Sequence, residues 1–342
     1  MKHSDYNQNI SYTPTPMLGL TLGDPAGIGP EIACKALADK RVQSNVIIIG
    51  DATAVQDACR HYTPTMDVHV LADYSNFKDG SINVLDMQIL DPGSIEIGKV
   101  QKSCGFASFK YIEKSIELAL AKKIDAVVTN PINKEAMHLA GFDYPGHTEI
   151  FAEKCGIKDF SMLFLLKNIG VAHVTTHCSL RRAIELVKTN RVVATIKLLN
   201  TAMTELGITQ PRLAVGGLNP HAGENGLFGD EEINEINPAI DICKKAGINV
   251  SGPYPPDTIF MRAFKGEFDG IAAMLHDHGF VALKSLDFEH GVNITIGLPI
   301  IRTSVGHGTA FNIAGKGVAS HESLVDAINA AERICRARRM IQ

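Results

Sequence analysis

The chain contains 342 residues, of which 45% are hydrophobic and 20% charged, and its formal net charge is −4. This composition is typical of a soluble globular protein with enough apolar material for two lobes. A net charge so near to zero excludes the strongly basic surface with which proteins bind nucleic acid or an anionic membrane, so neither partner is expected.

Cysteine usage and the amino-terminal residues bear on location. The seven cysteines are scattered without a C-x-x-C pair, which indicates a reducing compartment and argues against a structural zinc knuckle. Residues 1–16 are polar, contain two prolines and lack the apolar core of a signal peptide, so we expect a loose leader. No stretch is apolar for the ~18 residues that a membrane helix needs. A cytoplasmic location is therefore predicted.

Strands and helices are expected to alternate, which predicts an α/β protein with a mostly parallel core sheet. In chain order, the first expected elements are a strand over 17–22, a helix started by Pro30 and Glu31, a strand over 45–50, a helix over 53–62, an irregular excursion over 63–98, a helix over 102–123 and a strand over 124–129. The later ones are a helix after 144–149, strands over 161–166 and 171–176, a helix over 190–206, a strand over 212–218, a helix over 230–247, a short helix after 255–258, an apolar run over 271–275 and a helix over 322–339.

The glycine-rich turn of residues 23–31 follows the first strand, where backbone amides can approach a ligand closely. The turn is not the G-x-G-x-x-G fingerprint of a Rossmann dinucleotide site. By itself it is therefore only a weak signal for phosphate binding.

Three histidines share one setting. His177, His221 and His276 each lie in an expected loop just beyond the carboxyl end of an apolar strand. Ligands of α/β sheets bind at that edge, and three imidazoles meeting there would suit a divalent metal with positions left open for substrate. A single loop histidine is more often no ligand, and the spacing does not establish that the three converge.

Candidate anion-binding groups accompany these histidines. Lys284, Asn293 and Arg302 lie in or beside apolar segments and together fit a phosphate or carboxylate, although each cation alone is equally typical of an ordinary surface. His147 and Thr148 lie at an expected helix start, where free amides favour an anion, but a capping Thr148 fits this position as well. Carboxylates such as Asp257 are candidates for a general base, with a helix cap as the alternative.

As a set, the motifs resemble the 4-hydroxythreonine-4-phosphate dehydrogenase family. The matching segments are GDPAGIGPE (23–31), YPGHTE (144–149), TTH (175–177), LNPHAGENGLFGDEE (218–232), PPDT (255–258), LHDHG (275–279) and GVNITIGLPIIRTSVGHGTAF (291–311). The resemblance implies a two-lobed fold like that of isocitrate and isopropylmalate dehydrogenases. Residues 17–130 plus 303–342 would form the lobe on the cofactor side, and 131–302 the lobe with the metal ligands and the dimer interface.

The resemblance also implies roles for single residues. His177, His221 and His276 would bind a divalent metal (zinc, manganese, cobalt or magnesium), and the phosphorylated substrate would be bound by His147, Thr148, Lys284, Asn293 and Arg302. Asp257 and Lys284 are the candidate catalytic residues. The family implies NAD or NADP, held without a Rossmann fingerprint, and a homodimer whose metal site takes ligands from both subunits.

The combination of NKEAMHLAG (133–141) with GENGLFGDEE favours one branch of this family. That branch oxidises the C3 hydroxyl of 4-phospho-D-threonate or 4-phospho-D-erythronate and decarboxylates the product to dihydroxyacetone phosphate. The alternative branch acts on 4-phosphohydroxy-L-threonine in pyridoxal phosphate synthesis. The chain has His278 where the family usually has glutamine and Gly306 where it usually has aspartate, which affects cofactor preference and substrate geometry. A metal-dependent phosphatase or aldolase, or a binding protein for phosphorylated acids, are the rivals outside the family.

Overall fold

The computed structural model describes residues 14–73, 76–287 and 289–341, so the predicted leader lies outside these residues except for 14–16. One 12-stranded sheet runs through them in the order β3-β4-β2-β1-β5-β12-β11-β6-β7-β10-β8-β9. The first six strands are parallel to one another, and so are the last four. Between these two blocks, β11 and β6 pair antiparallel with their neighbours. The prediction of an α/β fold with a mostly parallel sheet is confirmed.

The strands of the six-strand block are β3 (Val68–Leu71), β4 (Ile82–Asp86), β2 (Asn45–Gly50), β1 (Met17–Thr21), β5 (Ala126–Thr129) and β12 (Ile301–Val305). The remaining strands are β11 (Gly291–Ile296), β6 (Ser161–Leu166), β7 (Ile169–His173), β10 (Gly270–Ala273), β8 (Leu213–Gly216) and β9 (Val250–Tyr254). The predicted lobe boundary at residues 302 and 303 falls inside β12, which pairs with β5.

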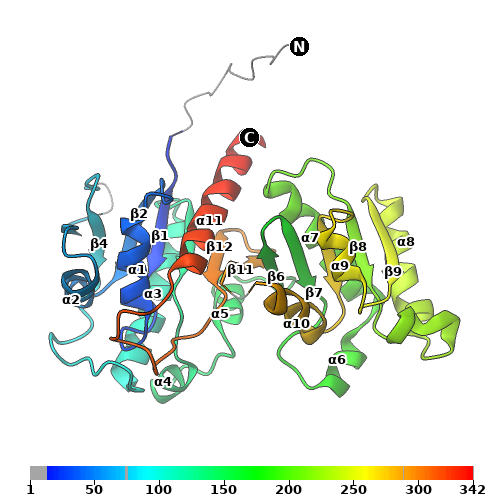
Figure 1. The fold of residues 1–342 in the computed structure, drawn as a ribbon, viewed down its shortest axis with the longest axis horizontal. Coiled ribbons are helices and arrows are strands. Elements are labelled where there is room, and N and C mark those ends of the chain that lie inside the picture. Colours follow the sequence, from blue (N-terminus) through cyan, green and yellow to red (C-terminus); the bar gives the residue numbers. More distant parts are fainter. Residues whose placement is uncertain (1–13, 74–75, 288, 342) are drawn as a thin grey trace, which may run out of the picture.

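Helices flank both blocks (Figure 1). Beside the six-strand block lie α1 (Gly29–Ala38), α2 (Ala52–Tyr62), α3 (Lys102–Leu120) and α11 (Glu322–Ile341), and beside the other lie α7 (Thr189–Glu205), α8 (Asn237–Lys245), α9 (Ile259–Phe264) and α10 (His276–Leu286). The short helices are α4 (Lys134–Leu139), α5 (His147–Lys154) and α6 (Leu180–Leu186). Of the helices so described, none is long and apolar enough to cross a membrane.

Two local expectations were wrong, and a third was confirmed with one irregularity. Residues 63–98, expected to be an irregular excursion, contain the strands β3 and β4. Because β3 lies at the sheet edge and most of its residues are partly exposed, its sequence lacks the continuous apolar run that predicts a buried strand. The helix expected over 230–247 is present, and it is π-helical over Glu232–Ile236 before it continues as α8, which has Pro238 in its first turn. His276 is not in a loop but is the first residue of α10, where Asp277 in the first turn suits the helix dipole.

Alternation along the inner strands divides the core between the two faces of the sheet. In β10, Ile271 and Ala273 join a small cluster beneath α9 and α10, whereas Ala272 joins the large cluster on the opposite face. The small cluster also contains Phe280 of α10. Burial on both faces explains why these strands read as continuous apolar runs.

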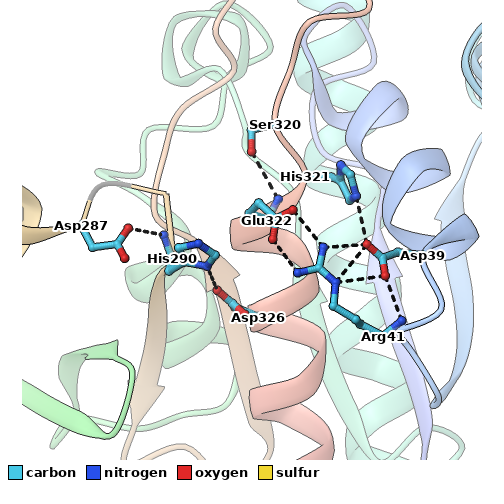
Figure 2. Close-up of polar contacts among 8 residues, drawn as sticks. All are labelled: Asp39, Arg41, Asp287, His290, Ser320, His321, Glu322 and Asp326. Atoms are coloured by element: carbon cyan, nitrogen blue, oxygen red, sulfur yellow. Dashed lines mark hydrogen bonds and ion pairs between the residues drawn. The ribbon is translucent and has the colours of Figure 1, made fainter.

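Polar contacts connect α11 to the six-strand block and to the segment that precedes β11 (Figure 2). The Arg41 guanidinium binds Asp39 and, at 2.7 Å, the carboxylate of Glu322 at the start of α11. One turn further along α11, Asp326 Oδ2 lies 2.9 Å from Nδ1 of His290, the residue that precedes β11. This hydrogen bond raises the pKa of His290. The pair therefore ties the connection between α10 and β11 to α11.

The raised pKa of His290 predicts a pH-dependent contribution to stability. A group whose folded-state pKa is raised stabilises the fold fully below its unfolded pKa of about 6.5 and loses that contribution as pH rises through the folded pKa. Because the pair is partly exposed, we expect the unfolding free energy of the wild type to exceed that of His290→Asn by about 0.5 kcal/mol at pH 6 and by less at pH 9. Urea unfolding at the two pH values measures this, and an equal difference at both would contradict it.

Candidate active site

A cleft of about 270 Å³ lies over the middle of the sheet, where β12 and β11 meet α5 and α10. It is lined by the five predicted substrate residues, His147, Thr148, Lys284, Asn293 and Arg302, and by His177 and His276. The structure thus brings together seven of the nine residues predicted from the sequence, from four elements and one loop. Its remaining lining includes Lys134, Glu149, Phe280, Ser304 and His307.

Arg302 is the buried cation of this cleft. It lies in β12, between β5 and β11, and only 3% of it is exposed. Its Nη2 donates to Thr129 Oγ1 at 2.7 Å and its Nη1 to Thr295 Oγ1 at 3.0 Å, while Nε has no partner. Burial lowers the pKa of Arg302 to about 9, so the guanidinium stays charged at neutral pH. A buried cation held only by neutral hydroxyls is suited to bind an anion.

His147 and Thr148 open α5 beside this cation. Thr148 Oγ1 lies 3.4 Å from Thr295 Oγ1, and Nε2 of His147 is shielded without a hydrogen-bond partner. Burial, together with the charges of Arg302 and Lys134, lowers the pKa of His147 well below its ordinary value, so the ring is neutral. The free amides at the start of α5 add donors for an anion at the same place.

Lys284 and Asn293 complete the set of donors. Asn293 Nδ2 donates to the Val305 carbonyl at 3.2 Å, which leaves Oδ1 without a partner. The Lys284 ammonium lies 5.1 Å from the centre of the Phe280 ring. Among the residues that line the cleft, Glu149 is the one carboxylate against several cations, so the cleft favours a phosphate or a carboxylate ligand.

The predicted metal ligands and Asp257 follow four neighbouring strands. β7, β10, β8 and β9 are adjacent and parallel, and their carboxyl ends lead to His177, His276, His221 and Asp257 respectively. The rings of His177 and His276 have centroids 5.9 Å apart. His221 and Asp257 are exposed and line neither this cleft nor the smaller one beside Thr175 and Asp277.

The two facing imidazoles have the surroundings of metal ligands. Nδ1 of His177 lies 3.4 Å from Glu149 Oε1, and Nδ1 of His276 lies 2.7 Å from Asp277 Oδ1. A carboxylate at Nδ1 holds the tautomer in which Nε2 carries the lone pair that a metal needs. Burial alone would raise the pKa of Glu149, but the hydrogen bond and charge of His177 outweigh it and lower that pKa. Within the described residues of one chain, no three His, Cys, Asp or Glu side chains are grouped to hold a metal.

His221 begins an unusual turn. His221, Ala222, Glu224 and Asn225 all have φ between 42° and 54°, the left-handed region that costs non-glycine residues energy. The buried carboxylate of Glu232 supports the turn by accepting the backbone N–H groups of Leu218 at 2.7 Å and Asn219 at 2.8 Å. The backbone thus presents the His221 side chain at the surface on a strained but well-bonded loop.

Sequence reasoning had assigned no role to several residues of the site. Glu149 closes the YPGHTE motif, so a carboxylate near the histidines could have been read from it. Phe280 falls at helical spacing between His276 and Lys284. His307 lines the cleft with a shielded, unpartnered Nε2, and burial lowers its pKa. At Gly306, a β-carbon would lie 3.0 Å from the Gly291 carbonyl oxygen, so this backbone leaves little room for a larger side chain.

Replacing Arg302 by lysine tests the anion site. Arg302→Lys keeps the positive charge but removes the planar fork of donors, so we expect inorganic phosphate to bind at least about tenfold more weakly. Isothermal titration calorimetry measures this affinity. Arg333→Lys, on the exposed side of α11, is the matched control and should bind phosphate like the wild type. Unchanged affinity in Arg302→Lys would remove the residue from the anion site.

Comparisons with known proteins agree with this chemistry. Residues 42–331 match the family model described as pyridoxal phosphate biosynthetic protein PdxA. The chain is 43% identical to D-threonate 4-phosphate dehydrogenase of Salmonella typhimurium, over 94% of this chain and 99% of that one, and 41% identical to the protein of the same name from Pectobacterium atrosepticum, over 93% and 99%.

Two solved structures are similar to this chain in both fold and sequence. A 4-hydroxythreonine-4-phosphate dehydrogenase from Klebsiella pneumoniae superposes with a TM-score of 0.85 at 42% identity, covering 94% of this chain and all of that one. A terephthalate 1,2-cis-dihydrodiol dehydrogenase from Burkholderia xenovorans gives a TM-score of 0.68 at 28% identity, with 94% and 98% covered.

Proposed function

Because the chain belongs to the family of the pyridoxal phosphate biosynthetic protein PdxA and is a dehydrogenase, we propose that it oxidises the C3 hydroxyl of 4-phospho-D-threonate or 4-phospho-D-erythronate. The reaction uses NAD or NADP and a divalent metal. Its product, a 3-keto acid, loses its carboxyl group as CO₂ and becomes dihydroxyacetone phosphate. The observation that carries the proposal is the buried Arg302, in a chain whose relatives are named for a phosphorylated threonate.

The phosphate end of the substrate is assigned to the donors around Arg302. Arg302, His147 and Thr148 surround the position where the phosphate oxygens would lie, and the unpartnered Nε of Arg302 is available to donate. Lys284 and Asn293 hold the other oxygens of the acid. Fixing the substrate at both ends orients its C3 atom, and orientation of this kind is a large part of enzymatic rate acceleration.

The metal is assigned to His177, His221 and His276. A bound divalent ion acts as a Lewis acid on a substrate oxygen, and zinc, manganese, cobalt and magnesium are the candidates. Glu149 and Asp277 support this role, since they orient the imidazoles of His177 and His276 for binding through Nε2. NAD or NADP, when bound, accepts the hydride from C3.

Removal of the hydroxyl proton is assigned to Asp257 and Lys284. Lys284 lines the cleft and can hold or pass on a proton at Nζ. Asp257 lies on the exposed loop between β9 and α9, outside the cleft of its own chain, so it can act only from a second copy of the chain. A metal site made of all three histidines likewise requires a second copy of the chain, because His221 lies outside the cleft that contains His177 and His276.

We therefore propose a homodimer in which His221 and His276 of one metal site come from different subunits. Exposed apolar side chains beside these loops support an interface there. Leu227 and Phe228, which follow His221, are 72% and 49% exposed, and Leu180 of α6, which follows His177, is 65% exposed. Exposed apolar side chains gathered around a site are typical of surfaces that pair with another chain.

The alternative function is oxidation of 4-phosphohydroxy-L-threonine on the route to pyridoxal phosphate. The Klebsiella structure named for this activity is 42% identical, as similar as the threonate relatives. The two substrates share the phosphate and the C3 hydroxyl, and they differ at C2, which carries an amine in one and a hydroxyl in the other. The donors around Arg302 bind the part that both share, so they serve either substrate.

Steady-state assays separate the two functions. With manganese or zinc present, we expect NADH formation from 4-phospho-D-threonate or 4-phospho-D-erythronate, and at least about tenfold lower kcat/KM with 4-phosphohydroxy-L-threonine. Removal of the metal with a chelator should abolish turnover. Exclusive use of the amino acid would establish the alternative, and NAD-independent release of inorganic phosphate would indicate a phosphatase.

Mixing two inactive variants tests the shared metal site. His221→Ala and His276→Ala should each lose metal and turnover. In a mixed dimer, one of the two sites receives both substitutions and the other receives none, so coexpression should restore up to about half of the activity per mixed dimer. Coexpression of His177→Ala with a second His177→Ala chain is the control that stays inactive. Absence of any recovery in purified mixed dimers would place His221 and His276 in the same subunit's site.

A further inference from the structure

The ring of Phe280 lies between two residues of the proposed site on one face of α10. His276, Phe280 and Lys284 are spaced four residues apart, so their side chains lie one above the other along the helix. The centroids of the His276 and Phe280 rings are 4.5 Å apart. On the other side, the Lys284 ammonium lies 5.1 Å from the centre of the same ring. One aromatic side chain therefore touches both residues.

Phe280 is itself held from behind by the sheet. Its ring stacks on His173 of β7, with centroids 4.7 Å apart and planes within 4°, and meets the edge of Phe164 of β6 at 5.1 Å. His173 is completely buried, and Phe280 is 7% exposed. A ring fixed on two sides by buried rings has one orientation, in contrast to a leucine or methionine side chain at the same position.

Gly279 permits this close packing. A β-carbon at this position would lie 2.3 Å from His173 Nε2 and 3.0 Å from Val171 Cγ1, so a larger residue would displace the His173 ring or move α10 away from β7. A glycine inside a helix normally destabilises the helix relative to alanine. Here it brings the helix that begins at His276 directly onto the strand that leads to His177.

We propose that Phe280, backed by His173, is a positioning residue that fixes the His276 imidazole and the Lys284 ammonium relative to each other. The inference rests on the proposed function for the roles of His276 and Lys284, but the stack itself is independent of it. A lysine has four rotatable bonds, and the cation–π contact with Phe280 restricts where its ammonium lies. The His276 imidazole likewise loses rotational freedom, because it lies between the Phe280 ring and the carboxylate of Asp277.

Three variants test the proposal. Phe280→Leu removes the ring face while filling similar volume, and Phe280→Tyr retains the ring. Phe268→Leu is the matched control, because Phe268 is 6% exposed in the same apolar cluster but does not line the cleft. If Phe280→Leu is insoluble, Phe280→Met takes its place with the same expectation. Manganese affinity is measured by calorimetry, and kcat and KM with the phosphorylated acid that the wild type oxidises.

We expect Phe280→Leu to bind manganese about tenfold more weakly and to lose at least about tenfold in kcat, the scale typical of residues that orient metal ligands. Phe280→Tyr should recover most of both, and Phe268→Leu should change only thermal stability. If Phe280→Leu and Phe268→Leu changed manganese affinity and kcat equally, or if neither variant changed them, Phe280 would be an ordinary core residue with no positioning role. If the wild type oxidises none of the acids, the proposed function fails, while the manganese affinities of the variants still decide the role of the stack.

Discussion

A buried positive charge is the constraint on which the centre of this molecule depends. Removing a guanidinium from water costs several kcal/mol unless other groups compensate. Arg302 has no carboxylate in direct contact, and its hydrogen bonds go to Thr129 on one neighbouring strand and Thr295 on the other. Both hydroxyls have the right position only if β12 lies between β5 and β11. The strand order and register therefore provide the hydrogen bonds that compensate the buried charge of Arg302. The same charge gives the cleft its affinity for an anion.

The second arrangement is the edge where four parallel strands end. Each strand delivers one candidate ligand or base, which gives a site with residues far apart in sequence but adjacent in the sheet. Carboxylates at Nδ1 of His177 and His276 orient two of the imidazoles within the chain. The strained turn at His221, supported by Glu232, holds the third histidine at an exposed position outside the cleft. In this geometry one chain supplies His177 and His276 to the proposed metal site, and a second copy of the chain would supply His221.

Much of this could be predicted from the sequence, because the signals are local. Continuous apolar runs predicted the parallel strands. The family resemblance, carried in part by residues 291–311, implied that Asn293 and Arg302 bind the same substrate, and both line the cleft. Other features depend on contacts between distant segments. The antiparallel orientation of β11 follows from its pairing with β6 and β12. The contact between Glu149 and His177 joins α5 to the loop that follows β7, so it depends on the tertiary fold. The role of Phe280 likewise required His173 beneath it, although its helical spacing from His276 was readable in advance.

The order of the strands has a consequence for synthesis on the ribosome. β5 and β6 are translated early, yet β12 and β11, which lie between them, come from residues 291–305 near the end of the chain. Until those residues emerge, β5 and β6 each expose unpaired backbone groups along one edge, and such edges invite pairing with other chains. Arg302 arrives with the strand that closes this gap. A nascent chain therefore acquires a closed sheet and its buried cation at the same late moment, and any truncation before β12 removes both.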